Sequence, residues 1–135
     1  MNPIHILLVE DSQLAQAVMI SNLIKHGCTV DTATDAEAAL EKAYDQHYDV
    51  ILMDIGLGNG PDGFDVATLI KNKSALNKKT SIVAISATDE PEFRDKAKEI
   101  GMVGYFNKPF TQKHAEKIVD FIKNDHLYRI VSHIK

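Results

Sequence analysis

Apolar runs and helical periodicity alternate five times along the 135 residues of the chain. The apolar runs predict strands at residues 5–9, 29–33, 49–53, 81–85 and 103–106, and each is followed by apolar residues at helical spacing. Residues 6–9 are continuously apolar, which is typical of a strand that is covered on both faces. The alternation predicts an α/β domain with a parallel sheet, and the second, more polar strand is expected at its edge.

Start and stop signals bound the helices between these strands. Ser12 and Asp35 are placed to cap the first two, Pro91 fits the first turn of the fourth, and Gly27 and Gly101 end the first and fourth. The predicted inward faces, helix by helix, are Leu14, Ala17, Val18 and Ile24; Ala36, Ala39, Leu40 and Ala43; Phe64, Ala67 and Ile70; Phe93, Ala97 and Ile100; and Ala115, Ile118, Val119 and Ile122. We expect residues 1–123 to form the domain and residues 124–135 to be a helix extension, a docking strand or a linker remnant.

Composition narrows the class of protein. Hydrophobic residues make up 44% and charged residues 25%, as in a soluble protein with one domain, and the net charge of −4 gives no basic footprint for nucleic acid. A single cysteine, Cys28, fits a reducing compartment and is expected to be a core residue that opens a strand. The sequence has no apolar stretch long enough to span a membrane and no signal peptide pattern, so we expect a cytoplasmic domain without membrane contact.

Polar side chains stand at four of the predicted strand ends. Glu10 and Asp11 follow the first strand, Asp54 the third, Ser86 the fourth, and Lys108 the fifth. We expect a flavodoxin-like (βα)5 doubly wound sheet of three layers, with strand order 2-1-3-4-5. Ligands bind at the point where this order reverses, between the first and third strands, so Asp11 and Asp54 should converge.

This set of residues suits a divalent cation and a phosphoryl group. Converged carboxylates repel each other unless a proton or a cation joins them, and Mg²⁺ favours carboxylate oxygens. We expect Asp11, Asp54 and a backbone carbonyl near Gly56 to bind Mg²⁺, and Glu10 to hold a metal-bound water. Lys108 would supply positive charge and Ser86 a hydrogen bond to a phosphoryl oxygen. Taken singly, each residue could be a helix cap, a turn acid, a strand-end hydroxyl or a surface lysine.

Over about residues 4–123 the chain resembles the receiver domain of two-component response regulators. The segments that carry the resemblance are ILLVEDS, VILMDI, IVAISA and GYFNKPF, in this order and spacing. The resemblance implies the following roles: Asp54 as phosphoacceptor, Glu10 and Asp11 as the acidic metal pair, Lys108 as the lysine on the phosphoryl group, Ser86 and Tyr105 as switch residues, Ala87 as a small residue that leaves room, and a cis peptide at Pro109.

One loop departs from the family pattern. Residues 54–64 read DIGLGNGPDGF, with Gly58 where a proline commonly stands and one extra residue before Gly63. This loop flanks the predicted metal site, so its flexibility and the lifetime of the phosphoryl group do not follow from the resemblance. Gly56 offers no side chain to an attacking water, which predicts hydrolysis that is not especially fast.

The resemblance implies a phosphorylation-controlled switch. A histidine kinase or histidine phosphotransfer domain would phosphorylate Asp54 with Mg²⁺, and the face made by the fourth helix, fifth strand and fifth helix would change. The domain would catalyse only its own phosphorylation and dephosphorylation, as a monomer or weak dimer. The resemblance favours the receiver of a hybrid sensor kinase; a stand-alone response regulator and a degenerate receiver that binds a protein without phosphorylation are the alternatives.

Two other classes of protein, a flavin-binding flavodoxin and a phosphatase with an aspartate nucleophile, fit less well. A flavodoxin would carry a hydroxyl-rich phosphate loop after the first strand, where this chain has EDSQLA. A phosphatase with an aspartate nucleophile would carry a second acid two residues on, where this chain has Gly56.

Overall fold

Five parallel strands form one sheet between two layers of helices. The computed structural model describes residues 3–57 and 61–134, with side chains described as far as residue 124. The strands are β1 (Ile4–Val9), β2 (Cys28–Ala33), β3 (Val50–Asp54), β4 (Ser81–Ser86) and β5 (Gly104–Asn107); the helices are α1 (Gln13–Lys25), α2 (Ala36–Asp45), α3 (Gly63–Lys73), α4 (Pro91–Glu99) and α5 (Gln112–Ile134). The strand order is β2-β1-β3-β4-β5, so the predicted flavodoxin-like fold is confirmed.

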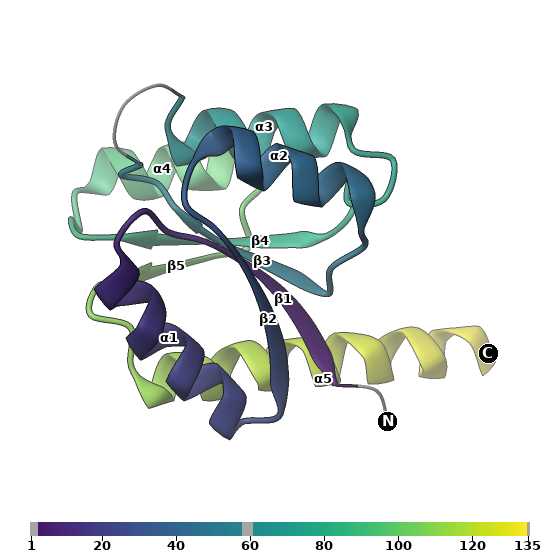
Figure 1. Cartoon of the computed structure of the whole chain (residues 1–135). Coiled ribbons are helices and arrows are strands. Elements are labelled where there is room, and N and C mark those ends of the chain that lie inside the picture. Colours follow the sequence, from purple (N-terminus) through teal and green to yellow (C-terminus); the bar gives the residue numbers. More distant parts are fainter. Residues whose placement is uncertain (1–2, 58–60, 135) are drawn as a thin grey trace.

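The sheet separates two hydrophobic clusters. Figure 1 shows α1 and α5 on one face, and α2, α3 and α4 on the other. Side chains alternate along β3, so that Ile51 and Met53 join the cluster under α2–α4, while Val50 and Leu52 join the cluster under α1 and α5. All four are buried, because a parallel sheet with helices on both faces leaves neither face to water.

The predicted helix ends agree with the structure where a capping side chain, a proline or a glycine determines them. The Ser12 and Asp35 side chains accept hydrogen bonds from the third residues of α1 and α2. Pro91 is at the start of α4. Gly27 and Gly101 have φ of 83° and 88°, a conformation that side chains with a Cβ rarely adopt.

The predicted inward face of α1 is wrong. Leu14, Val18 and Ile24 are 78%, 46% and 58% exposed, Ala17 is also exposed, and the buried residues are Met19 and Leu23. Apolar residues lie on most sides of this helix, so their spacing allows two rotations about its axis. The Gln16 Nε2 donates to the main-chain oxygen of Glu10, at 2.6 Å, which turns the side of residues 16, 19 and 23 toward the sheet.

The inward faces predicted for the other helices agree with the structure. Their residues are buried or pack against the two clusters, and Cys28 is a buried residue at the start of β2. Helix α5 runs on to Ile134, so the 124–134 segment extends this helix. No helix in the described residues is long and apolar enough to cross a membrane. Gly58, the main departure from the family loop, lies outside the described residues.

A buried polar cluster joins two loops at the edge of the sheet where the strands begin. Asn77 Oδ1 accepts from the main-chain nitrogen of Tyr48, at 2.9 Å, and its Nδ2 donates to the main-chain oxygens of Ala43 and Gln46. Thr80 Oγ1 also donates to Asn77 Oδ1, at 2.9 Å. Because these loops leave main-chain groups inside the fold, Asn77 satisfies them in place of water.

Candidate functional site

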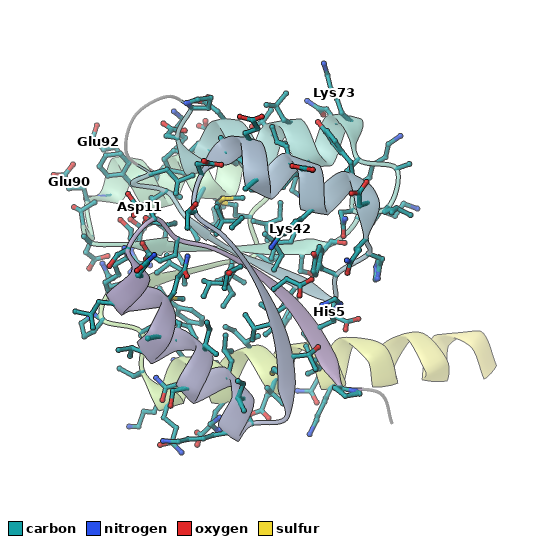
Figure 2. The ribbon with its side chains drawn as sticks, viewed as in Figure 1. His5, Asp11, Lys42, Lys73, Glu90 and Glu92 are labelled. Atoms are coloured by element: carbon teal, nitrogen blue, oxygen red, sulfur yellow. The ribbon has the colours of Figure 1, made fainter. Side chains whose placement is uncertain are left out.

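Three acidic residues converge at the carboxyl ends of β1 and β3. One carboxylate oxygen from each of Glu10, Asp11 and Asp54 lies within 4.8 Å of the others. Strands β1 and β3 are neighbours, with Val9 opposite Met53, so topology brings their last residues together. Glu10 and Asp54 are buried and Asp11 is exposed. Figure 2 shows Asp11 at this end of the molecule, from which Glu90 and Glu92 also project, and His5 at the other end of β1.

Lys108 reaches two of these acids. Its Nζ lies 2.7 Å from Glu10 Oε1 and donates to Asp54 Oδ2 at 3.1 Å. Although this is an ion-pair distance, Glu10 Oε1 is buried and has no hydrogen bond of normal geometry in the described part of the chain. The other oxygen of Glu10 accepts from the main-chain nitrogen of Ser12 at 3.0 Å. Glu10 Oε1 is therefore an oxygen that can still bind a cation.

Burial and charge set the protonation of the site. Burial, together with the charge of Asp54, raises the pKa of Glu10 to about 7, against the opposing effects of Lys108 and of the Ser12 main-chain nitrogen. Burial lowers the pKa of Lys108, but the nearby carboxylates of Glu10 and Asp54 outweigh this and raise the pKa overall. Lys108 is thus a permanent cation, while three acids exceed the charge that it can balance. The donor set and the Glu10 Oε1 oxygen fit a divalent cation with oxygen ligands.

The Asp54 carboxylate is fixed from both sides. Its Oδ1 accepts from the main-chain nitrogen of Gly56 at 2.9 Å, and its Oδ2 accepts from Lys108. Behind it, Gly63 at the start of α3 approaches the Asp54 main chain so closely that a Cβ there would lie 2.3 Å from the Asp54 carbonyl oxygen. Any larger residue at position 63 would therefore force the main chain of β3 or of the start of α3 to move.

Ser86 lies at the end of β4, next to the end of β3 that carries Asp54. Asp54 is opposite Ile85 in the β3–β4 register, so Ser86 is the next residue along. Ser86 is buried, and its Oγ accepts from the main-chain nitrogen of Thr88 at 3.1 Å, which leaves its hydroxyl hydrogen able to donate. The main-chain nitrogen of Lys108 donates to the Ser86 carbonyl oxygen at 2.7 Å. Ala87 is exposed.

Tyr105 lies on β5 with its ring partly buried against the α2–α4 cluster. Its hydroxyl donates to the carbonyl oxygen of Thr88 at 2.8 Å. The Lys108–Pro109 peptide is cis. Sequence reasoning did not find three residues that complete this arrangement: Thr88, Arg94 and Asn107. Asn107, just before Lys108, could have been suspected from its place at a strand end.

Comparisons with known proteins place this geometry in a family. The family model for the response regulator receiver domain matches residues 6–120. Protein PilG of Pseudomonas aeruginosa is 33% identical over 110 residues, which cover 82% of this chain and 80% of PilG. Much longer relatives also match: the chain spans 5% and 3% of two histidine kinases, from Candida albicans and Dictyostelium discoideum.

Solved structures agree with this assignment. The chemotaxis protein CheY4 of Vibrio cholerae is 29% identical, with a TM-score of 0.78, covering 89% of this chain and 98% of that one. The receiver domain of sensor histidine kinase PA1611 from Pseudomonas aeruginosa is 30% identical, with a TM-score of 0.76, covering 86% and 93%; that structure has a magnesium ion coordinated in the active site cleft. The chain therefore belongs to the response regulator receiver domain family of two-component signalling.

Proposed function

We propose that Asp54 accepts a phosphoryl group from phosphohistidine and that its phosphorylation switches the domain. The observation that carries this proposal is the position of the buried Asp54 carboxylate, which lies among Glu10, Asp11 and Lys108 at the reversal of strand order. In the transfer, an Asp54 oxygen bonds to phosphorus as the P–N bond breaks, and the imidazole nitrogen keeps the electron pair. The product is an acyl phosphate.

We propose Mg²⁺ as the cofactor. Glu10, Asp11, Asp54 and the Gly56 carbonyl would hold it, and the presence of magnesium in the PA1611 receiver supports this choice. When bound, Mg²⁺ supplies positive charge that offsets the repulsion between the carboxylates and the phosphoryl oxygens. The chain's own residues do the rest: Gly56 orients Asp54, and Lys108 neutralises charge on the side of Oδ2.

Ser86 and Tyr105 are the proposed switch residues. The free hydroxyl hydrogen of Ser86 can donate to a phosphoryl oxygen on Asp54, and Ala87 beside it adds little bulk. Thr88 joins the two switch residues, because its main-chain nitrogen donates to Ser86 and its carbonyl oxygen accepts from Tyr105. Movement of Ser86 toward the phosphoryl group would therefore affect Thr88 and, through it, Tyr105 on β5 and the face made by α4, β5 and α5.

The phosphodonor partner is a histidine kinase or a histidine phosphotransfer domain. A groove of about 390 Å³ borders the site and is lined mainly by apolar side chains of α1 and of the segment after Lys108, including Leu14, Val18, Pro109 and Phe110. A partner that fills this groove lies next to Lys108, and therefore next to Asp54. The exposure of Leu14 and Val18, which do not pack in the domain core, supports this docking face.

The context of the domain is also a proposal. Similarity to histidine kinases supports a hybrid sensor kinase, whereas the match over most of PilG supports a short response regulator. We expect residues 1–123 to be the receiver, the following residues to be an extension of α5, and the domain to act in the cytoplasm as a monomer or weak dimer.

The test is the intact mass after incubation with acetyl phosphate and Mg²⁺, for the parent and for Asp54→Asn. A single acid-stable, base-labile phosphoryl adduct is expected in the parent and not in the variant. Circular dichroism of Asp54→Asn should show a retained fold. Equal labelling of the variant would refute the assignment of Asp54. No adduct in the parent, under conditions where a known receiver is labelled, would favour a domain that binds its partner without phosphorylation.

A further inference from the structure

Arg94 of α4 contacts three residues around the end of β5. Its guanidinium carbon lies 4.6 Å from the centre of the Tyr105 ring, a cation–π distance. Its Nη2 donates to Asn107 Oδ1 at 3.1 Å, and its Nε donates to Asp89 Oδ1. One side chain therefore joins α4, β5 and the loop between β4 and α4.

Two side chains of β5 donate hydrogen bonds to the carbonyl oxygen of Thr88. It accepts from the Tyr105 hydroxyl at 2.8 Å and from Asn107 Nδ2 at 2.9 Å. The main-chain nitrogen of the same residue donates to Ser86 Oγ. Thr88 thus has one main-chain group on the proposed switch hydroxyl and the other on the proposed switch aromatic.

Asn107 links the contacts of Arg94 and Thr88 to the acidic site, because it directly precedes Lys108. Arg94 occupies its Oδ1 and Thr88 its Nδ2, so both ends of the amide are used. The next residue is Lys108, which binds Ser86 through its main chain and Glu10 and Asp54 through its side chain. Arg94 has no contact with the three carboxylates of the acidic site in the described part of the chain, but it holds Asn107, the residue before Lys108.

We propose that Arg94 is a positioning residue that holds Tyr105 and Asn107 against Thr88 and so sets the resting state of the switch. It holds the Tyr105 ring inward, with the hydroxyl on Thr88 and the ring against the core cluster, which is the arrangement that the proposed switch would adopt on phosphorylation. A residue that favours this arrangement in the unphosphorylated domain lowers the cost of reaching it on phosphorylation. The effect on phosphorylation rests on the proposed function of Asp54, whereas the effect on Tyr105 does not.

The contacts of Arg94 differ in strength. The Arg94 and Asp89 side chains are 45% and 66% exposed, so their ion pair is screened and weak. The stacking on Tyr105 and the hydrogen bond to Asn107 are the contacts that reach the switch. A planar guanidinium can make both at once, whereas the ammonium of lysine lacks the forked donors.

The experiment is fluorine NMR of the full chain labelled with 3-fluorotyrosine, with the Tyr105 resonance assigned by Tyr105→Phe. Arg94→Ala should shift or split this resonance, and Arg94→Lys should give a smaller change of the same kind. Lys73→Ala is the control, because it removes one positive charge from an exposed position on α3, away from the contacts that Arg94 makes. It should leave the resonance in place. An unchanged Tyr105 resonance in Arg94→Ala, or an equal change in Lys73→Ala, would overturn the proposal.

Labelling by acetyl phosphate and Mg²⁺ adds a second readout. Arg94→Ala should label at Asp54 about threefold more slowly than the parent, which is the size expected for loss of an exposed cation–π contact. Lys73→Ala should label at the parental rate. Equal rates in all three proteins would overturn the link between Arg94 and the acidic site. If the parent itself fails to label, the proposed function fails, while the fluorine spectra still decide whether Arg94 holds Tyr105.

Discussion

Gly63 approaches the main chain of Asp54 so closely that adding one methyl group tests how the site is built. A Cβ at Gly63 would lie 2.3 Å from the Asp54 carbonyl oxygen and 2.6 Å from the Ile55 Cα, whereas real Cβ contacts are essentially never below 3.0 Å. The shortfall from 3.0 to 2.3 Å is 0.7 Å. Because both neighbours are main-chain atoms, no side-chain rotation can relieve the overlap, and β3 or the start of α3 must move.

The expected loss of stability follows from two opposing effects. Alanine is favoured over glycine within a helix by up to about 1 kcal/mol. Overpacking that shifts the main chain costs about 1–3 kcal/mol, and this overlap belongs at the upper end. Gly63→Ala should therefore lose about 2 kcal/mol of unfolding free energy, which lowers the urea midpoint by about 1 M for a typical denaturant slope.

The matched control is Gly56→Ala on the other side of Asp54. A Cβ at Gly56 would meet Asp54 Oδ1 at 3.5 Å, an ordinary contact, and the expected change is within about 0.5 kcal/mol. Urea denaturation followed by circular dichroism measures both. The labelling rate of Gly63→Ala with acetyl phosphate should also fall, by up to about 100-fold for a shift near 1 Å. An unchanged urea midpoint for Gly63→Ala would refute the reasoning.

Three other predictions concern separate parts of the molecule. Asn77→Ala leaves buried main-chain groups unsatisfied and should cost about 3 kcal/mol in urea denaturation, while the exposed Asn72→Ala should cost little. Val18→Asp, in the groove beside Lys108, should slow transfer from a phosphorylated histidine protein far more than labelling by acetyl phosphate; Ile24→Asp, outside the groove, should affect neither. Burial lowers the pKa of His114 from 6.5, so its contribution to stability is full above that pH and falls as the pH drops below it. The variant His114→Gln keeps an acceptor for the Thr111 main-chain nitrogen, so its denaturation midpoint should fall less than that of the parent between pH 7.5 and pH 5. An equal fall in both proteins would contradict this.

The fold and the gathering of acids could be predicted because both follow from local patterns and one topological rule. Apolar runs that alternate with helical spacing specify a parallel sheet, and the ends of its strands meet at one edge. Asp11 and Asp54 therefore converge whatever the details of helix packing. The helix ends at Gly27 and Gly101 could be predicted equally well, because their backbone conformation favours glycine.

The rotation of α1 and the contacts of Arg94 could not be predicted in this way. Leu14 and Val18 satisfy helical spacing as well as Met19 and Leu23 do, and a long-range contact such as that of Gln16 with Glu10 decides between them. The Arg94 contacts with Tyr105 and Asn107 depend on how α4 sits against β5. No spacing rule within either segment contains that information.

The charge balance of the site explains why a change at Asp54 should be felt in the loop after β4. Three carboxylates face one lysine, so the group is negative overall even when Glu10, with its pKa of about 7, carries a proton. In the proposed function, a phosphoryl group with a charge of about −2 replaces the single charge of Asp54, which increases the demand for positive charge and hydrogen-bond donors. Lys108 already supplies its charge at rest, and the Ser86 hydroxyl is a donor that can still be recruited. Ser86 Oγ is bound to the main chain of Thr88, and Thr88 to Tyr105 and Asn107, so recruitment of that hydroxyl must act on the same residues that Arg94 holds.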